Sequence, residues 1–307
     1  GIDLYRDFPA STPDLAETLT QPNIIGVCKS RDPAADTRGI GPAPEMTVTQ
    51  VGFSDFIEEI DGVLRRQLLT LTPDPVSPCT AMYGFAALIA IHYLQGDNIQ
   101  PSFTPQGSLQ LGDTIFPRLD GRTGGLQRFD SRGNQLLLNY RAQPSPDQLV
   151  AKVPLQQLLN GEVNPASIRD RIVLIGVVGT SGDYWSTPYG VQAQDRTPGV
   201  FLQAQMISQL ISAVLEARSL IWVWPQWAEA SCVAMVAIMG SLLAWQWQST
   251  RLGIAYLLAV GGLVGGAWAT FLIGGWLPLV PALLALSGGT LSTKLLTRLS
   301  TQSEHTG

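Results

Sequence analysis

Histidine, cysteine and charged residues are scarce in this sequence of 307 residues, and each shortage excludes a class of protein. Of the two histidines only His92 precedes the C-terminal tail, so neither a histidine-activated nucleophile nor a metal-ligand cluster is expected. Charged residues amount to 14%, and the net charge of −5 includes no basic stripe, so nucleic acid is not an expected partner. We therefore expect no catalytic residues, no metal and no cofactor.

The last third of the chain has almost no charge, and its apolar residues form three long runs. Residues 228–247, 252–273 and 276–296 are each close to the roughly 20 residues that cross a hydrocarbon core of about 30 Å. Small residues run along the second segment, which favours close helix packing. Tryptophans fall at the predicted interfaces, as expected of an aromatic belt: Trp222, Trp224, Trp227, Trp245, Trp247 and Trp276. We expect three transmembrane helices.

The few positive charges in this region predict its orientation. Arg251 lies between the first two spans, Lys294 and Arg298 follow or end the third, and the turn at residues 273–275 is neutral. Positive residues favour the cytoplasmic side, so the first turn and the C-terminus are expected there, with the N-terminal part outside. The expected divisions are an extracytoplasmic domain at 1–220, an interfacial linker at 221–227, the membrane region at 228–296 and a cytoplasmic tail at 297–307. Because the sequence opens within an apolar segment, we also expect an incomplete beginning.

The first part of the chain shows the alternation of an α/β domain. Apolar strand patterns at residues 2–5 and 23–28 flank a short helix that starts at Ser11-Thr12-Pro13-Asp14, which favours parallel strands. Further on we expect a hairpin with its turn at Asp61-Gly62, helices at 80–94 and 155–159, and antiparallel strands at 108–111, 114–119 and 135–140. The expected fold is an α/β extracytoplasmic domain with a mixed, mainly parallel sheet plus antiparallel strands, followed by three transmembrane α-helices.

Residues 171–218 are the segment around which the rest is organised. Residues 171–179 predict a buried strand, because β-branched residues run almost without interruption. Thr197-Pro198 predicts a helix start with a threonine N-cap. The residues that then follow at helical spacing predict one apolar face: Val200, Ala204, Ile207, Ile211 and Val214. This helix leads through the tryptophan-rich linker to the first span, as expected of a sensor.

The loop after the predicted strand is the expected ligand site, because open α/β sheets bind ligands at the carboxyl ends of their strands. Asp3 and Asp183 would converge there if the sheet is parallel. The expected ligand-binding residues are Asp3, Thr180, Ser181, Asp183 and Thr187, with Tyr184 and Trp185 as an apolar wall. The alternative for each is a residue that caps a turn or fills the core, a common role for Asp, Ser and Thr in loops.

Two of the three cysteines belong to the outer domain. Cys28 and Cys79 are expected to form a disulfide in an oxidising exterior, with two small buried thiols as the alternative. Cys232 lies in a predicted span and is expected only to pack there.

Three features in order resemble the second type of CHASE domain, an extracytoplasmic sensory module. They are GIDLYRDFP followed by DLAETL, then DRIVLIGVVGTSGDYWSTPYG followed by PGVFLQAQMISQLI, and finally three spans with Trp-Leu-Pro-Leu before the last. Residues 53–56, 61–66 and 138–140 are similar to the cyanobacterial branch. The resemblance implies an N-terminal anchor, an outer ligand-sensing domain and a cytoplasmic output. Many relatives have histidine where Gln203 stands, so a role of that imidazole is not expected here.

The sequence thus predicts a membrane-anchored receptor that transmits an extracytoplasmic signal to an output not contained in this chain. Its expected partners are the membrane, a small-molecule or protein signal, and a cytoplasmic signalling module in cis or in trans; a homodimer is compatible with this interpretation. Two alternatives stay open. One is a protein-interaction or assembly module without a small ligand. The other is a carboxylate-based membrane-bound hydrolase, which requires Asp3 and Asp183 to meet in one cleft with a perturbed pKa.

Overall fold

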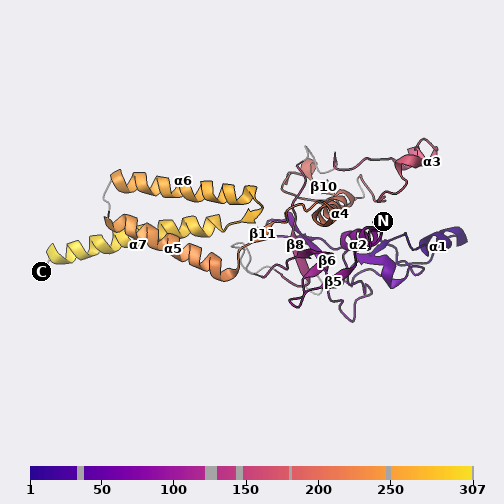
Figure 1. Ribbon diagram of the computed structural model, residues 1–307, viewed down its shortest axis with the longest axis horizontal. Coiled ribbons are helices and arrows are strands. Elements are labelled where there is room, and N and C mark those ends of the chain that lie inside the picture. Colours follow the sequence, from indigo (N-terminus) through magenta and orange to yellow (C-terminus); the bar gives the residue numbers. More distant parts are fainter. Residues whose placement is uncertain (33–37, 122–129, 143–147, 180–181, 247–249, 306–307) are drawn as a thin grey trace. The chain divides into compact units, whose positions relative to one another are not determined.

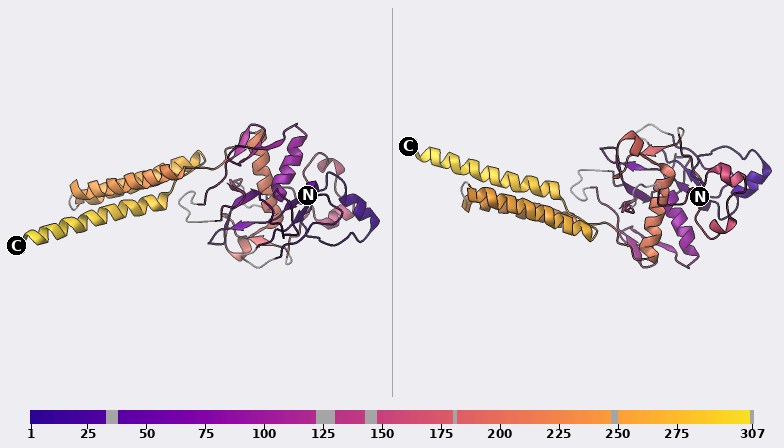
Figure 2. Two further views of the ribbon diagram at one scale, coloured as in Figure 1. Left: turned by 90° about the horizontal axis from the view of Figure 1, so that it is seen from below. Right: turned by 90° about the horizontal axis from the view of Figure 1, so that it is seen from above.

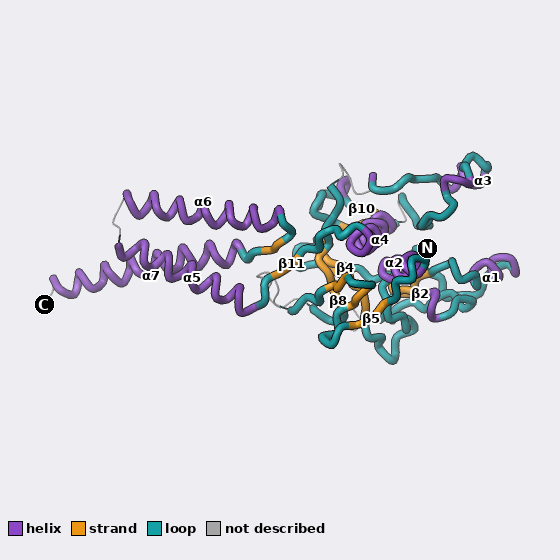
Figure 3. Tube along the Cα trace, viewed as in Figure 1, coloured by secondary structure: helices purple, strands orange, loops and turns teal. Residues whose placement is uncertain are grey.

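The computed structural model describes residues 1–32, 38–121, 130–142, 148–179, 182–246 and 250–305 (Figure 1). The chain divides into two compact units: an N-terminal unit of Gly1–Leu119 and Ser131–Leu220, and a membrane unit of Asp120–Asp130 and Ile221–Gly307. Parallel and antiparallel strand pairs in the first unit and three apolar helices in the second confirm the expected fold class. Figure 3 shows where the helices and strands lie along the chain.

Parallel pairing brings distant parts of the N-terminal unit together. Strand β1 (Gly26–Cys28) pairs in parallel with β2 (Val51–Phe53), and Ile2 bridges Ile175 in parallel. Residues 1–3 lie between the segments of Ile25 and Ile175, because the N–H of Ile2 donates to the Ile25 carbonyl at 2.8 Å and that of Asp3 donates to the Ile175 carbonyl at 2.8 Å. Asp3 and Ser54 therefore both stand at the ends of paired segments.

Antiparallel strands complete the unit in two three-stranded sheets. One sheet is ordered β3 (Ile57–Glu58), β4 (Leu64–Thr70) and β8 (Asn134–Leu137), and the other β5 (Pro101–Phe103), β6 (Leu109–Leu111) and β7 (Thr114–Phe116). The predicted turn between β3 and β4 is confirmed: Gly62 has a φ of +72°, a conformation that glycine adopts without a steric penalty, and Asp61 accepts from the N–H of Val63. Beyond these sheets, β9 (Tyr184–Trp185) pairs antiparallel with β10 (Thr197–Pro198).

Helices α2 (Phe85–Gln95) and α4 (Gly199–Leu215) lie side by side and bury most of their residues in the core (Figure 2). The predicted helix at 80–94 begins later, at Phe85, because Met82, Tyr83 and Gly84 hydrogen-bond to strand residues instead. Helix α1 (Pro13–Leu19) begins as predicted, with the Thr12 hydroxyl accepting from the N–H of Leu15. Short 3-10 turns at Val48–Gln50, Pro165–Ser167 and Ala193–Asp195 complete the unit, together with α3 (Leu155–Leu159).

The prediction of a buried strand at residues 171–179 is wrong. The segment is extended, but among the described residues its bridge is limited to Ile2–Ile175, and its burial alternates. Ile172 and Leu174 pack on the core, while Val173 and Ile175 are 43% and 51% exposed. The physical reason is that no described element covers the face that carries Val173 and Ile175. Strong β propensity did not determine burial.

The predicted start of α4 is also wrong in detail. Thr197 pairs with Trp185 in the β9–β10 bridge, so α4 begins at Gly199 with Pro198 as its N-cap and no side-chain cap. The prediction of a single apolar face is incomplete as well. The side chains of Gln203, Gln205 and Gln209 are buried as Val200, Ala204 and Ile207 are, whereas Ile211 and Val214 are only half-buried.

The membrane unit contains three helices long and apolar enough to cross a bilayer, as predicted: α5 (Gln226–Gln246), α6 (Thr250–Leu272) and α7 (Leu279–His305). Helices α5 and α7 pack closely through Gly240 and Gly289, where an added Cβ would collide with a backbone carbonyl of the facing helix. Before α5, β11 (Trp222–Val223) pairs in parallel with β12 (Gly275–Trp276), the turn between α6 and α7.

Candidate functional site

A chain of hydrogen bonds joins Asp3 to α4. The Gln203 amide donates from Nε2 to the Ser54 hydroxyl at 3.0 Å, and that hydroxyl donates to Oδ1 of Asp3 at 3.0 Å. Gln203 is 3% exposed and Ser54 is 5% exposed, so this connection runs through the interior. Paired segments place Asp3 and Ser54 at neighbouring ends, and the second turn of α4 brings Gln203 to them. Hydrogen bonds through Ser54 therefore connect the Asp3 carboxyl to α4.

Asp183 lies at the N-terminus of α4, near the Asp3 carboxyl. The N–H of Gly199 donates to the backbone carbonyl of Asp183 at 3.1 Å, and the indole of Trp185 donates to Oδ2 at 2.9 Å. The Asp183 carboxylate is so close to the backbone of Gly199 that an added Cβ there would collide with it. A helix N-terminus favours negative charge, which explains why a carboxylate is accommodated here. We call Asp3, Ser54, Asp183 and Gln203 the carboxylate cluster.

The electrostatics of the carboxylate cluster make Asp3 unusual. Burial raises the pKa of Asp3 to about 6, since desolvation disfavours the charged form. The hydrogen bond from Ser54 opposes this rise, and the negative charge of Asp183 adds to it. This coupling indicates that the two carboxyls are near enough to influence each other. Asp3 can therefore gain or lose a proton near neutral pH.

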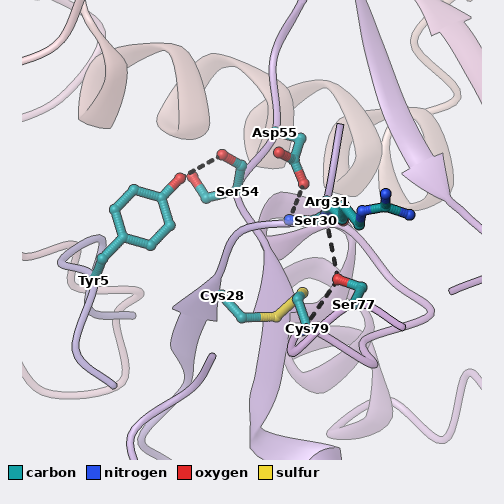
Figure 4. Close-up of a disulfide and its surroundings, with 8 residues drawn as sticks. All are labelled: Tyr5, Cys28, Ser30, Arg31, Ser54, Asp55, Ser77 and Cys79. Atoms are coloured by element: carbon teal, nitrogen blue, oxygen red, sulfur yellow. Dashed lines mark hydrogen bonds between the residues drawn. A yellow bond between two sulfur atoms is a disulfide. The ribbon is translucent and has the colours of Figure 1, made fainter. Parts of the chain in front are cut away.

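Aromatic and acidic side chains surround the cluster. Tyr5 donates from its hydroxyl to the Ser54 carbonyl at 2.7 Å, as Figure 4 shows, and burial raises its pKa. Asp55 accepts from the N–H of Ser30 at 3.0 Å, and burial raises the pKa of this carboxyl too. The rings of Phe56 and Trp185 pack with their centroids 4.9 Å apart. The cluster thus combines a protonatable carboxyl with an apolar wall.

The structure brings two of the predicted ligand-binding residues close together, Asp3 and Asp183. Asp3 and Asp183 belong to the carboxylate cluster, whereas Thr180 and Ser181 lie outside the described residues. Thr187 is fully buried, and its hydroxyl accepts from the N–H of Tyr189 at 3.2 Å, so it closes the turn at 187–190. The Tyr184 hydroxyl accepts from the N–H of Gly179 at 3.0 Å and so supports the loop.

Sequence reasoning missed Ser54 and the position of Gln203 in the site. A weak signal existed for each: Ser54 directly follows a buried strand, and Gln203 lies four residues after Gly199, on a helix face that the core covers. Neither signal indicated that the two side chains meet, because they are separated by 149 positions in the sequence.

Cys28 and Cys79 form a disulfide in the structure, with their Cα atoms 5.4 Å apart (Figure 4). Both are buried beside Phe53, at the end of β2 that leads to Ser54. Ser77 accepts from the N–H groups of Arg31 and Cys79 at 3.1 and 3.2 Å, so hydrogen bonds also join the two segments that carry the cysteines. The disulfide therefore braces the segment that carries Ser54.

The chemistry available at the cluster is proton exchange and recognition of polar ligands. Within the described residues, no group of three or more His, Cys, Asp or Glu side chains is arranged to hold a metal ion. The hydrogen bonds of Asp3 and Asp183 go to Ser54 and Trp185, and no bond joins the two carboxyls in the described part of the chain.

Comparison with known proteins supports a sensory role. The model of the CHASE2 domain family matches residues 1–242, which is more than half of the chain. No curated protein and no solved structure matches the chain. The match does not distinguish branches of the family, so the cyanobacterial resemblance stays a prediction. The chain belongs to the CHASE2 family of extracytoplasmic sensory domains.

Proposed function

We propose that this protein is a membrane-anchored sensor that receives a signal at the carboxylate cluster and passes it to a cytoplasmic output in cis or in trans. The observation that carries the proposal is the hydrogen-bond chain from Asp3 through Ser54 to Gln203, because it links the cluster to α4. Membership of a sensory family and three helices long enough to cross a membrane support it.

Helix α4 is suited to carry a change because it is held in register from two sides. On one side Gln203 binds Ser54. On the other, the amide of Gln209 accepts from the N–H of Asn139 at 3.1 Å and donates to the Leu137 carbonyl at 3.0 Å. A signal shifts such a system only by binding one arrangement better than the other. A ligand that favours one state of the cluster would therefore move α4 relative to the strand that holds it.

The linker after α4 connects to more than one membrane helix. Residues 216–225 lead from α4 to α5, and within them the N–H of Trp222 donates to the Gly274 carbonyl at 2.8 Å. The indole of Trp222 also donates to the Ile273 carbonyl at 3.2 Å. Because Gly274 lies in the turn between α6 and α7, a displacement of the linker would reach α5 and this turn together.

The proposed orientation keeps residues 1–220 outside, 221–227 at the interface, 228–296 in the membrane and 297–307 in the cytoplasm. A membrane-impermeant maleimide on intact cells tests it. Val191→Cys, at a position 59% exposed, should be labelled, whereas Glu304→Cys should react only after the cells are permeabilised. The reverse pattern would refute this orientation.

The ligand site is tested by thermal unfolding of the full chain in nanodiscs, screened against metabolites and ions. A ligand that acts at the cluster should raise the Tm in a saturable way, since binding to the folded state stabilises it. Asp183→Ala should abolish this rise, and Asp97→Ala, an exposed aspartate at the end of α2, should preserve it. A folded chain without any hit would count against a small-molecule signal.

Transmission of the signal from the carboxylate cluster to α4 and the linker is tested by a separate measurement. With a ligand in hand, hydrogen exchange of α4 and of residues 216–225 should change on binding in the parent chain. Gln203→Leu removes the bond to Ser54, so the change at α4 and the linker should shrink while exchange around Asp183 still responds. Equal responses in both chains would show that the signal does not travel through Gln203.

One observation favours a second candidate, a protein-interaction or assembly module. The outer side of residues 173–178 exposes apolar side chains, and α3 exposes Leu155 and Leu159 at 68% and 71%. If this surface binds a protein, Ile175→Asp should abolish capture of the partner while leaving the Tm unchanged. A hydrolase is not favoured, because hydrogen bonds direct the carboxyls of Asp3 and Asp183 to other residues.

A further inference from the structure

The side chains of Gln205 and Arg218 both reach the backbone of residues 139–141, the stretch that also carries Arg141. Arg218, just after α4, donates from Nη2 to the Asn139 carbonyl at 2.8 Å and to the Tyr140 carbonyl at 3.4 Å. Gln205 of α4 accepts through Oε1 from the N–H of Arg141 at 3.2 Å. Two side chains of the α4 region thus meet one stretch of three residues that contains Arg141.

Hydrogen-bond donors remain unused at this place. Nη1 of Arg218 and Nε2 of Gln205 are buried nitrogens that have no partner among the described residues. Gln205 is 3% exposed, so water does not readily replace a partner there. Buried donors are almost always satisfied in folded proteins, and each exception needs an explanation. Both unused atoms carry N–H groups and neither accepts, so the missing group is an acceptor.

The charge around these donors is positive. Burial lowers the pKa of Arg218, and the nearby positive charge of Arg141 lowers it further. Glu216, which is exposed, and the hydroxyl of Tyr189 act in the opposite direction. The ion pairs found in the described chain join Arg31, Arg65 and Arg66 to carboxylates, and none involves Arg141 or Arg218. Arg141 instead donates from Nε to the Ser208 hydroxyl at 2.7 Å.

We propose that Arg141, Gln205 and Arg218 form a binding site for a small oxyanion, a carboxylate or a phosphate. A guanidinium presents N–H groups in a planar fork that matches the oxygens of a carboxylate or phosphate, and the Gln205 amide offers one more N–H donor. The bound oxyanion offsets the two like charges and satisfies both unused donors. It also ties residue 141 to Arg218, whose N–H donates to the Ser212 carbonyl of α4 at 3.0 Å. The site is independent of the ligand proposed at the carboxylate cluster.

Thermal unfolding of the full chain in a maltoside detergent at pH 7 tests the proposal. Sodium acetate and sodium phosphate are titrated separately, with sodium chloride holding the ionic strength constant. At least one of them should raise the Tm in a saturable way, and the one that does identifies the oxyanion class. Arg218→Gln should weaken the apparent Kd at least tenfold, whereas Arg169→Gln, at an exposed arginine without a described side-chain partner, should not. An equal rise with chloride alone would show charge screening and would overturn the proposal.

Gln205→Glu gives a second, independent test. The new carboxylate keeps one oxygen for the N–H of Arg141 and places the other where the unused donor was. If the site binds oxyanions, this variant should have a higher Tm than the parent without any added oxyanion and should no longer respond to acetate or phosphate. A lower Tm together with an unchanged response would show a merely structural glutamine and contradict the site.

Discussion

Helix α4 of the N-terminal unit and helices α5 and α7 of the membrane unit are held in place by different means. Helix α4 buries glutamines whose amides bind strand residues and Ser54. Helices α5 and α7 approach through Gly240 and Gly289, and the hydroxyls of Ser241 and Thr290 reach carbonyls of the facing helix at 3.3 Å.

The difference follows from the surroundings of each helix. In water, apolar burial is non-directional and can tolerate sliding, so the buried amides add a fixed register to α4. In lipid, burial drives helices together only weakly, and close backbone contact at small residues takes over. Helix α4 is therefore positioned by directional amide hydrogen bonds, and α5 and α7 are positioned mainly by close backbone contact.

The largest expected effect concerns the disulfide of the N-terminal unit, a cross-link that the membrane unit, with Cys232 as its single cysteine, does not have. Replacing Cys28 and Cys79 together by serine should lower the free energy of unfolding of the N-terminal unit by about 4 kcal/mol, because the disulfide closes a loop across a sequence separation of 51. Denaturant unfolding of the full chain under non-reducing conditions measures it. Cys232→Ser, in the membrane unit, should change this transition little, and equal effects would mean that the disulfide is not formed.

The stability of the N-terminal unit should change with pH in a way that depends on Asp3. Its folded-state pKa of about 6 lies above the ordinary value of 3.8, so the folded state holds a proton that the unfolded state loses first. Stability should fall as the pH rises from about 4 to 6, by up to roughly 3 kcal/mol at pH 7. Asp3→Asn should remove the part of this decline that Asp3 causes and raise the Tm at pH 7, while the raised pKa of Asp55 leaves a smaller decline. Parallel pH profiles of the variant and the parent would exclude Asp3 as the cause, and Asp97→Asn is the matched control.

Removing the hydrogen bonds that Gln209 of α4 makes should lower the free energy of unfolding by somewhat less. Gln209→Leu leaves the Asn139 N–H and the Leu137 carbonyl without their partners, at about 2–3 kcal/mol in total. Hydrogen exchange should then show faster opening of residues 137–141 while α2 stays protected. Gln95→Leu, at an exposed end of α2, is the control and should have almost no effect. An equal loss of stability in both variants would argue against the view that the Gln209 amide fixes the position of α4.

The smallest expected effect is a difference in stability between a glycine variant on α7, which packs against α5, and one on α6. Gly289→Ala places a methyl group against the Ala237 carbonyl and should lower the stability of the membrane unit by about 1–2 kcal/mol. Gly265→Ala on α6 meets no atom within 4 Å and should be neutral or slightly favourable. Thermal unfolding in detergent compares them. A larger loss at Gly265 would show that the α6 glycines form a contact between chains.

Sequence reasoning succeeded where structure is decided locally or by composition. The hairpin at Asp61-Gly62, the start of α1 at Thr12 and the three long apolar helices follow from turn chemistry, capping and hydropathy. It failed at residues 171–179, because propensity indicates an extended backbone but does not say whether a second layer covers it. It failed again at Thr197, where pairing with Trp185 takes precedence over capping.

The sequence by itself determined that the chain has an α/β part and a membrane part joined by a short linker, since composition and periodicity act over neighbouring residues. Only the tertiary structure decided that Asp3, Ser54 and Gln203 meet, and that Gln205 and Arg218 both reach the stretch that carries Arg141. Such meetings depend on which paired segments and helix turns end side by side. A residue type shows what chemistry it offers, and only the packed fold supplies the neighbour that uses it.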